Sequence, residues 1–144
     1  MEKKAGCERE KTNVLKRKEP ADIEDGLKNH SERFFMNIFD VPRDLVKGER
    51  SELLIPDKGV RIERIVSKDS PSPPGFWYDQ ERDEWVCLIQ GQARILWEDG
   101  RRQSLVAGDW LLIPAHEKHR VEETSENPPC IWIAVHGKLT GINC

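Results

Sequence analysis

Short runs of β-branched and aromatic residues recur along most of the chain, and turn-forming residues separate them. The segment 60–66 (V-R-I-E-R-I-V) begins with the alternation of a strand that buries one face. Asp99 and Gly100 form a tight-turn dipeptide between two such runs, which indicates a hairpin. Strands are expected at 51–56, 60–66, 85–89, 93–97, 102–106, 109–113, 119–124 and 131–135. Short strands at this spacing, without a helical period between them, predict an all-β sandwich or barrel.

The first part of the chain has a different character. Residues 1–33 are polar, mixed in charge and almost free of large apolar side chains. Such a composition buries too little surface to offset chain entropy, so we expect a flexible tail at 1–33 and one domain at 34–144. The aromatic run at 34–39 (F-F-M-N-I-F) needs a core to cover it, and a short helical turn is expected after Pro42.

Composition narrows the functional classes. The 144 residues carry a net charge of −3 with a pI near 5.9, which argues against a nucleic-acid binder. No stretch approaches the roughly 18–20 apolar residues of a membrane span, and the charged N-terminus is unlike a secretory signal. We therefore expect a cytoplasmic protein that binds neither nucleic acid nor a membrane. The four cysteines form no C-x-x-C pair, so a zinc knuckle is not expected.

Two segments carry the candidate chemistry. In the first, Glu84 is followed seven positions later by Gly91. In the second, Gly108, Pro114 and His119 are spaced by six and then five positions. Glycine allows a sharp backbone bend, and proline can end a strand where a missing N–H does no harm.

These two segments, in this order, resemble the two conserved motifs of the cupin superfamily. The string Ile-Pro-Ala-His-Glu-Lys-His (113–119) is similar to that of small bacterial single-domain cupins. The resemblance implies a cupin-type double-stranded β-helix, a jelly-roll barrel, with a ligand site in the barrel mouth. It also implies a homodimer, and a divalent iron, manganese, nickel or zinc ion held by histidines and one glutamate.

The sequence departs from the family motif where two histidines normally stand. With three residues before Glu84, their places are taken by Tyr78 and Gln80; with four, by Trp77 and Asp79. We favour the first alignment, because Tyr78 and Gln80 share a face of an extended chain. Imidazole and carboxylate groups with open positions suit such metals, but this donor set is depleted. A bound metal and a metal-free cavity therefore both stay open.

Candidate site residues follow from the resemblance. The expected metal donors are Gln80, Glu84, His116 and His119. The expected ligand contacts are Trp77, Tyr78, Gln80 and Arg64, with Tyr78 and His116 as proton-transfer groups. In the alternative interpretation, Glu84 pairs with Arg61, Arg64 or Arg120, and His136 is an ordinary hydrogen-bonded histidine.

Two functions are compatible with these residues. The first is a metal-dependent enzyme of the isomerase, dioxygenase, lyase or decarboxylase class. The second is a metal-free module that binds a small or sugar-like ligand. A cupin-type transcription factor is disfavoured, because residues 1–33 are too short for a helix-turn-helix and lack its apolar period.

Overall fold

The computed structural model describes residues 36–141, and within them the chain is all-β. The strands are β1 (Gly48–Leu53), β2 (Arg61–Lys68), β3 (Asp83–Gln90), β4 (Gln92–Trp97), β5 (Arg102–Val106), β6 (Trp110–Ile113), β7 (His119–Thr124) and β8 (Cys130–Gly137). Each of the eight expected ranges overlaps one of these strands, so the predicted fold class is confirmed. The tail expected at 1–33 lies outside the described residues.

The segment after Pro42 was expected to make a helical turn. It forms one hydrogen-bonded turn, in which the Leu45 N–H donates to the Pro42 carbonyl at 3.1 Å. No helix able to cross a membrane is found between residues 36 and 141.

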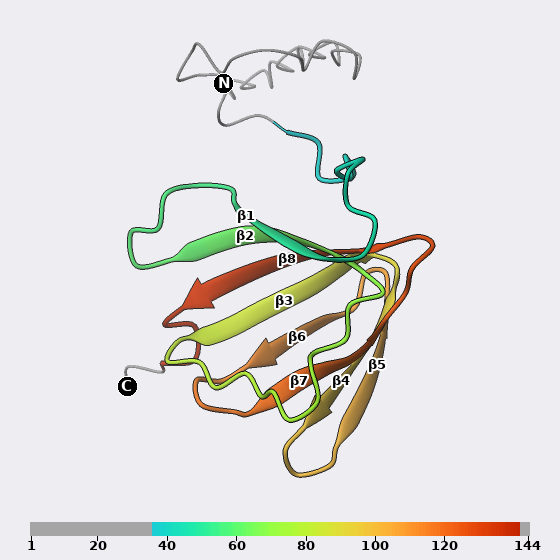
Figure 1. The fold of residues 1–144 in the computed structure, drawn as a ribbon. Coiled ribbons are helices and arrows are strands. Elements are labelled where there is room, and N and C mark those ends of the chain that lie inside the picture. The colour runs from blue at the N-terminus through green and yellow to red at the C-terminus, as the bar shows by residue number, and fades with distance from the viewer. Residues whose placement is uncertain (1–35, 142–144) are drawn as a thin grey trace, which may run out of the picture. The chain divides into compact units, whose positions relative to one another are not determined.

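The strands form two antiparallel sheets that pack against each other (Figure 1). One sheet has five strands in the order β1-β2-β8-β3-β6, and the other has three in the order β5-β4-β7. Within the larger sheet, β8 lies between β2 and β3 and pairs with both, although it is distant from them in sequence. This crossover places residues of β2, β8 and β3 side by side in the larger sheet.

The core lies between the two sheets and follows from the period-two pattern of the strands. In β4, Ala93, Ile95 and Trp97 are buried while the residues between them are more exposed. The three-stranded sheet thus turns one apolar face inward. The buried cluster consists of Val86, Leu88, Ala93, Ile95, Trp97, Leu105, Ile113, Cys130, Trp132 and Ala134.

Gly91 carries the chain from one sheet to the other. It is the single residue between β3 and β4, and its φ of +91° lies in the left-handed region that favours glycine. A Cβ at this position would lie 2.9 Å from Cys130 Cα and 2.8 Å from Ser125 Oγ. The bend expected at Gly91 therefore requires a residue without a side chain.

The segment between β2 and β3 runs beside the first residue of β7. Tyr78 and His119 form an isolated antiparallel bridge, with backbone N–H···O distances of 2.8 and 3.3 Å. The His116 N–H also donates to the Gln80 carbonyl at 2.7 Å. These bonds hold residues 78–80 extended, so that Tyr78 and Gln80 share a face as the sequence predicts.

Candidate functional site: an acidic cavity between the sheets

A cavity of about 260 Å³ opens between the two sheets. Residues of β1, β2, β3, β4, β6, β7 and β8 contribute to it, together with the segment 78–80. Its polar lining is Glu49, Ser51, Arg61, Glu63, Tyr78, Gln80, Glu84, His119 and His136. Its apolar lining is Ile65, Val86, Ile95, Ile113, Val121 and Trp132. A lining that combines apolar side chains with a few polar groups is the usual composition of a small-molecule site.

Glu84 and His119 meet in this cavity from opposite sheets. Their side chains are 10% and 6% exposed, and Glu84 Oε2 lies 3.5 Å from His119 Nε2. Glu84 Oε2 is buried and has no hydrogen-bond partner among the described residues. Buried carboxylate oxygens are normally paired, so this atom is available to a proton, a water molecule or a cation.

The orientation of the His119 ring is fixed from its other nitrogen. His119 Nδ1 lies 2.8 Å from the backbone carbonyl of Glu117, which can only accept, so Nδ1 carries a proton. Burial lowers the pKa of His119, but the Glu84 carboxylate and the Glu117 carbonyl outweigh it and the net pKa is raised. In the neutral ring, Nε2 directs its lone pair toward Glu84.

A second histidine–glutamate pair lines the same cavity. His136 Nε2 lies 3.2 Å from Glu63 Oε1 and 4.0 Å from Glu84 Oε1. Glu63 Oε2 accepts hydrogen bonds from Arg61 Nε and Nη2 at 3.1 and 3.0 Å and from Ser51 Oγ at 3.0 Å. Arg61 is thus paired with Glu63, and the contacts of Glu84 are with histidines.

Sequence reasoning did not assign His136 and Glu63 to the site. The alternation of 60–66 does place Arg61 and Glu63 on one face, but it does not say which face is inward. Glu84 and His136 become cross-strand partners in β3 and β8, and this register joins strands that are distant in sequence. The pairing of β8 with β3 therefore supplies the missing residues.

Tyr78 and Gln80 both line the cavity, whereas Asp79 between them does not. The Tyr78 ring stacks on the His119 ring with centroids 5.4 Å apart and planes at 23°. Burial, together with the charges of Glu49, Glu84 and Glu63, raises the pKa of the Tyr78 phenol. The phenol is therefore a hydrogen-bond donor at neutral pH.

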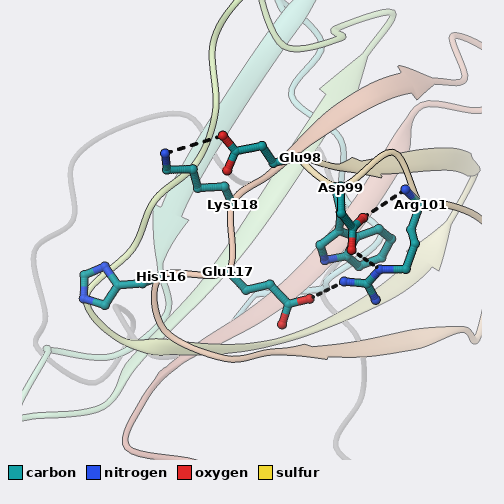
Figure 2. Close-up of a pocket in the computed structure, with 7 residues that line it drawn as sticks. Glu98, Asp99, Arg101, His116, Glu117 and Lys118 are labelled. Atoms are coloured by element: carbon teal, nitrogen blue, oxygen red, sulfur yellow. Dashed lines mark hydrogen bonds and ion pairs between the residues drawn. The ribbon is translucent and has the colours of Figure 1, made fainter.

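His116 does not lie with the other expected donors. Its side chain is 66% exposed, and its Nδ1 lies 2.9 Å from Asp79 Oδ1. It lines a separate surface groove in which Arg101 pairs with Asp99 and Glu117 (Figure 2). The expectation that His116 joins the cavity is therefore wrong, because its loop turns at a φ of +64° and its ring pairs with Asp79 instead.

Arg64 and Trp77 also lie outside the cavity lining. Arg64 is 3% exposed and pairs with Glu52, Nη2 to Oε2 at 2.7 Å. Its Nη1 donates to the Asp40 carbonyl at 2.6 Å, so it ties the segment before β1 to β2. Trp77 instead packs against Arg120, whose guanidinium carbon is 5.9 Å from the ring centroid. These two residues therefore make contacts within the protein and are not part of the cavity lining, contrary to the prediction that they contact the ligand.

The donors present fit a divalent cation in part. Among residues 36–141, no three histidine, cysteine, aspartate or glutamate side chains are already arranged as a metal site. The pair Glu84 and His119 nevertheless offers a carboxylate oxygen and an imidazole nitrogen, with His136 next to it. Imidazole and carboxylate donors suit divalent iron, manganese, nickel and zinc.

Comparisons with known proteins agree with this architecture. A family model described as Cupin domain matches residues 70–136. A solved structure named as a putative mannose-6-phosphate isomerase, from Ralstonia eutropha JMP134, is 43% identical, covering 73% of this chain and 98% of its own, with a TM-score of 0.67. A cupin superfamily protein from Desulfitobacterium hafniense DCB-2 is 20% identical, covering 63% and 78%, with a TM-score of 0.53.

HppE in its Fe(II) form has the same fold at 17% identity, covering 66% of this chain and 53% of its own, with a TM-score of 0.53. No curated protein matches this chain. The chain belongs to the cupin superfamily, as its two motifs predict. Its all-β jelly roll is the cupin fold.

Proposed function

We propose that this cupin binds a divalent cation between Glu84 and His119 and acts on a small polar molecule in the same cavity. The observation that carries the proposal is the buried Glu84 Oε2, which lacks a hydrogen-bond partner among the described residues and lies 3.5 Å from His119 Nε2. A cation placed between these two atoms would satisfy both, because one is a carboxylate oxygen and the other can present a lone pair.

The charge of the cavity supports a cation. Three glutamates and one arginine line it, so its formal charge is −2 with both histidines neutral. A divalent ion would cancel this charge in a site partly shielded from water, where charge interactions are strong. His136 is the third donor that we propose, in place of His116, because it lies beside Glu84.

A bound cation would supply Lewis-acid polarisation of a substrate oxygen. Tyr78 and Gln80 would orient the substrate by hydrogen bonds, and Tyr78 would hold a proton at its phenol oxygen. The Ralstonia relative is named as an isomerase, which favours the isomerase class among the enzyme reactions considered.

The second candidate is a metal-free binding module. It is favoured by Tyr78 and Gln80, which replace two nitrogen donors in the cavity wall and are good hydrogen-bonding groups for a polyhydroxylated ligand. In that case a protonated His119 would neutralise Glu84. For either function we retain a cytoplasmic homodimer, with 34–144 as the cupin domain and 1–33 as its tail, as predictions from the sequence.

Metal content of the purified protein distinguishes these functions. Wild type, His119→Ala, His136→Ala and the control His116→Ala would each be loaded with iron, manganese, nickel or zinc and then mildly chelated. We expect stoichiometric metal in wild type and in His116→Ala, a loss in His119→Ala and weaker retention in His136→Ala. Full retention in His119→Ala would contradict the proposed site. A wild type that takes up none of the four metals would favour the binding module.

A further inference from the structure

We infer that the small molecule taken by this cavity carries no phosphate or other strongly anionic group. The inference rests on the proposed small-molecule function and names the class of its ligand. It concerns the charge pattern of the cavity wall: without metal the wall is negative, and a divalent cation would bring its formal charge to zero rather than make it positive.

Three glutamates line the cavity, against a single permanently charged arginine, Arg61. Glu63 and Glu84 are both buried in the wall, while Glu49 on β1 is more exposed to solvent. Glu49 Oε2 accepts a hydrogen bond from Ser67 Oγ at 3.0 Å, and no arginine or lysine among the described residues pairs with it. A phosphate entering here would meet like charges in a shielded site.

The arginine and the two histidines of the wall already face carboxylates. Arg61 directs Nε and Nη2 at Glu63 Oε2, and His136 lies 3.2 Å from the other oxygen of the same carboxylate. His119 faces Glu84. No lysine is part of the described lining. Phosphate sites are normally built from arginine forks, lysines or helix N-termini, and this cavity offers none of these uncommitted.

The size of the cavity agrees with a small ligand. Its volume of about 260 Å³ is below the lower end of the range usual for drug-sized ligands. The apolar lining residues Ile65, Val86 and Trp132 can contact the less polar face of such a molecule, while Tyr78 and Gln80 can hydrogen-bond its hydroxyl groups. The phosphorylated substrate in the name of the Ralstonia relative would therefore not carry over to this chain.

The ring resonances of His119 and His136 can be followed by NMR during titration with inorganic phosphate and with mannose 6-phosphate. Sodium chloride at equal ionic strength is the reference. The protein is used as purified and again after chelation, so that any phosphate bound by a metal ion is distinguished from phosphate bound by the wall itself. We expect no saturable shift of either ring. A saturable shift at low millimolar concentration would overturn the inference.

Charge variants test whether the glutamates of the cavity are what excludes phosphate. In Glu49→Gln/Glu63→Gln, two negative charges are removed and Arg61 is freed, so phosphate should now give a saturable shift, with at least a tenfold gain in affinity over wild type. Glu49→Gln alone, at an exposed position, should give a smaller gain and keeps the test valid if the double variant misfolds. Glu98→Gln, in the surface groove, is the matched control and should give none. Charge variants that fold but remain unresponsive would refute the electrostatic explanation.

Discussion

The ring of Tyr78 lies over the ring of His119, with centroids 5.4 Å apart and planes inclined by 23°. The ring of Tyr78 also meets that of Phe76 edge to face, with centroids 4.8 Å apart, and its backbone bridges to His119. Tyr78 therefore covers one side of the imidazole that faces Glu84. This contact links the segment between β2 and β3 to the site.

Replacing Tyr78 should separate its packing role from its hydroxyl. Tyr78→Phe keeps the ring, so the free energy of unfolding should change by less than about 0.5 kcal/mol while ligand binding weakens. Tyr78→Ala removes both aromatic contacts and should destabilise the fold by about 1–3 kcal/mol. Urea denaturation of the two variants measures the difference. Equal destabilisation by both would show that the phenol oxygen, and not the ring, maintains the structure.

The raised pKa of His119 depends on Glu84. In metal-free protein, Glu84→Gln should lower the His119 pKa, because burial then opposes only the hydrogen bond to Glu117. An NMR titration of the His119 ring measures this shift, and Glu98→Gln is the control that should leave it unchanged. An unaltered His119 titration in Glu84→Gln would mean that the two side chains are not coupled.

The same pair gives stability a pH dependence. A histidine whose folded pKa is raised stabilises the fold fully below its unfolded pKa, near 6.5, and loses this contribution as pH rises through the folded value. Metal-free wild type should therefore lose stability relative to Glu84→Gln as the pH rises from mildly acidic to mildly alkaline. Urea midpoints across this interval measure the difference. A constant difference would argue against a charged His119–Glu84 pair.

Asp83 anchors two loops next to the cavity. Its carboxylate accepts N–H bonds from Ala115, Leu139 and Thr140 at 2.8–2.9 Å, and from the Thr140 hydroxyl at 2.9 Å. The backbone N–H donors hold the pKa of Asp83 well below its usual range, and the N–H of Ala115 has the largest effect. Its charged form is therefore strongly preferred in the folded state.

Asp83→Asn should lower the melting temperature by several degrees at neutral pH. A carboxyl group with a depressed folded pKa contributes stability above its unfolded pKa, near 3.8, and loses it as pH falls through the folded value. The gap between wild type and Asp83→Asn should therefore close in acid. Melting curves at neutral and strongly acidic pH measure it. A gap that persists undiminished in acid would point to packing as its cause.

Substitution of Gly91, with Gly108 as the control, tests the sharp bend that carries the chain from β3 in one sheet to β4 in the other. Both have positive φ, +91° and +98°, but a Cβ would clash with Cys130 only at Gly91. Gly108→Ala should cost about 1–2 kcal/mol from the backbone conformation, and Gly91→Ala about 1–3 kcal/mol more. Denaturant midpoints compare the two. Equal costs would show that the crossing relaxes around the added methyl group.

Local patterns in the chain were enough to predict the strands and the motif positions. Alternation and turn residues depend on local chemistry, so the eight strand ranges and the bend at Gly91 could be predicted without long-range information. The spacing that resembles the cupin motifs predicted that Glu84 and His119 share one cavity, and their side chains lie 3.5 Å apart there. The period of an extended chain likewise put Tyr78 and Gln80 on one face.

The remaining residues of the cavity are brought together by strand pairing over long distances in sequence. His136 reaches Glu84 through the pairing of β8 with β3, and Glu63 reaches His136 through the pairing of β8 with β2. His116 is close to His119 in sequence, yet its exposed ring pairs with Asp79 outside the cavity. Period-two alternation predicts which residues of a strand share a face. Which face points inward, and which side chains it contacts there, depends on the pairing of strands that are distant in sequence.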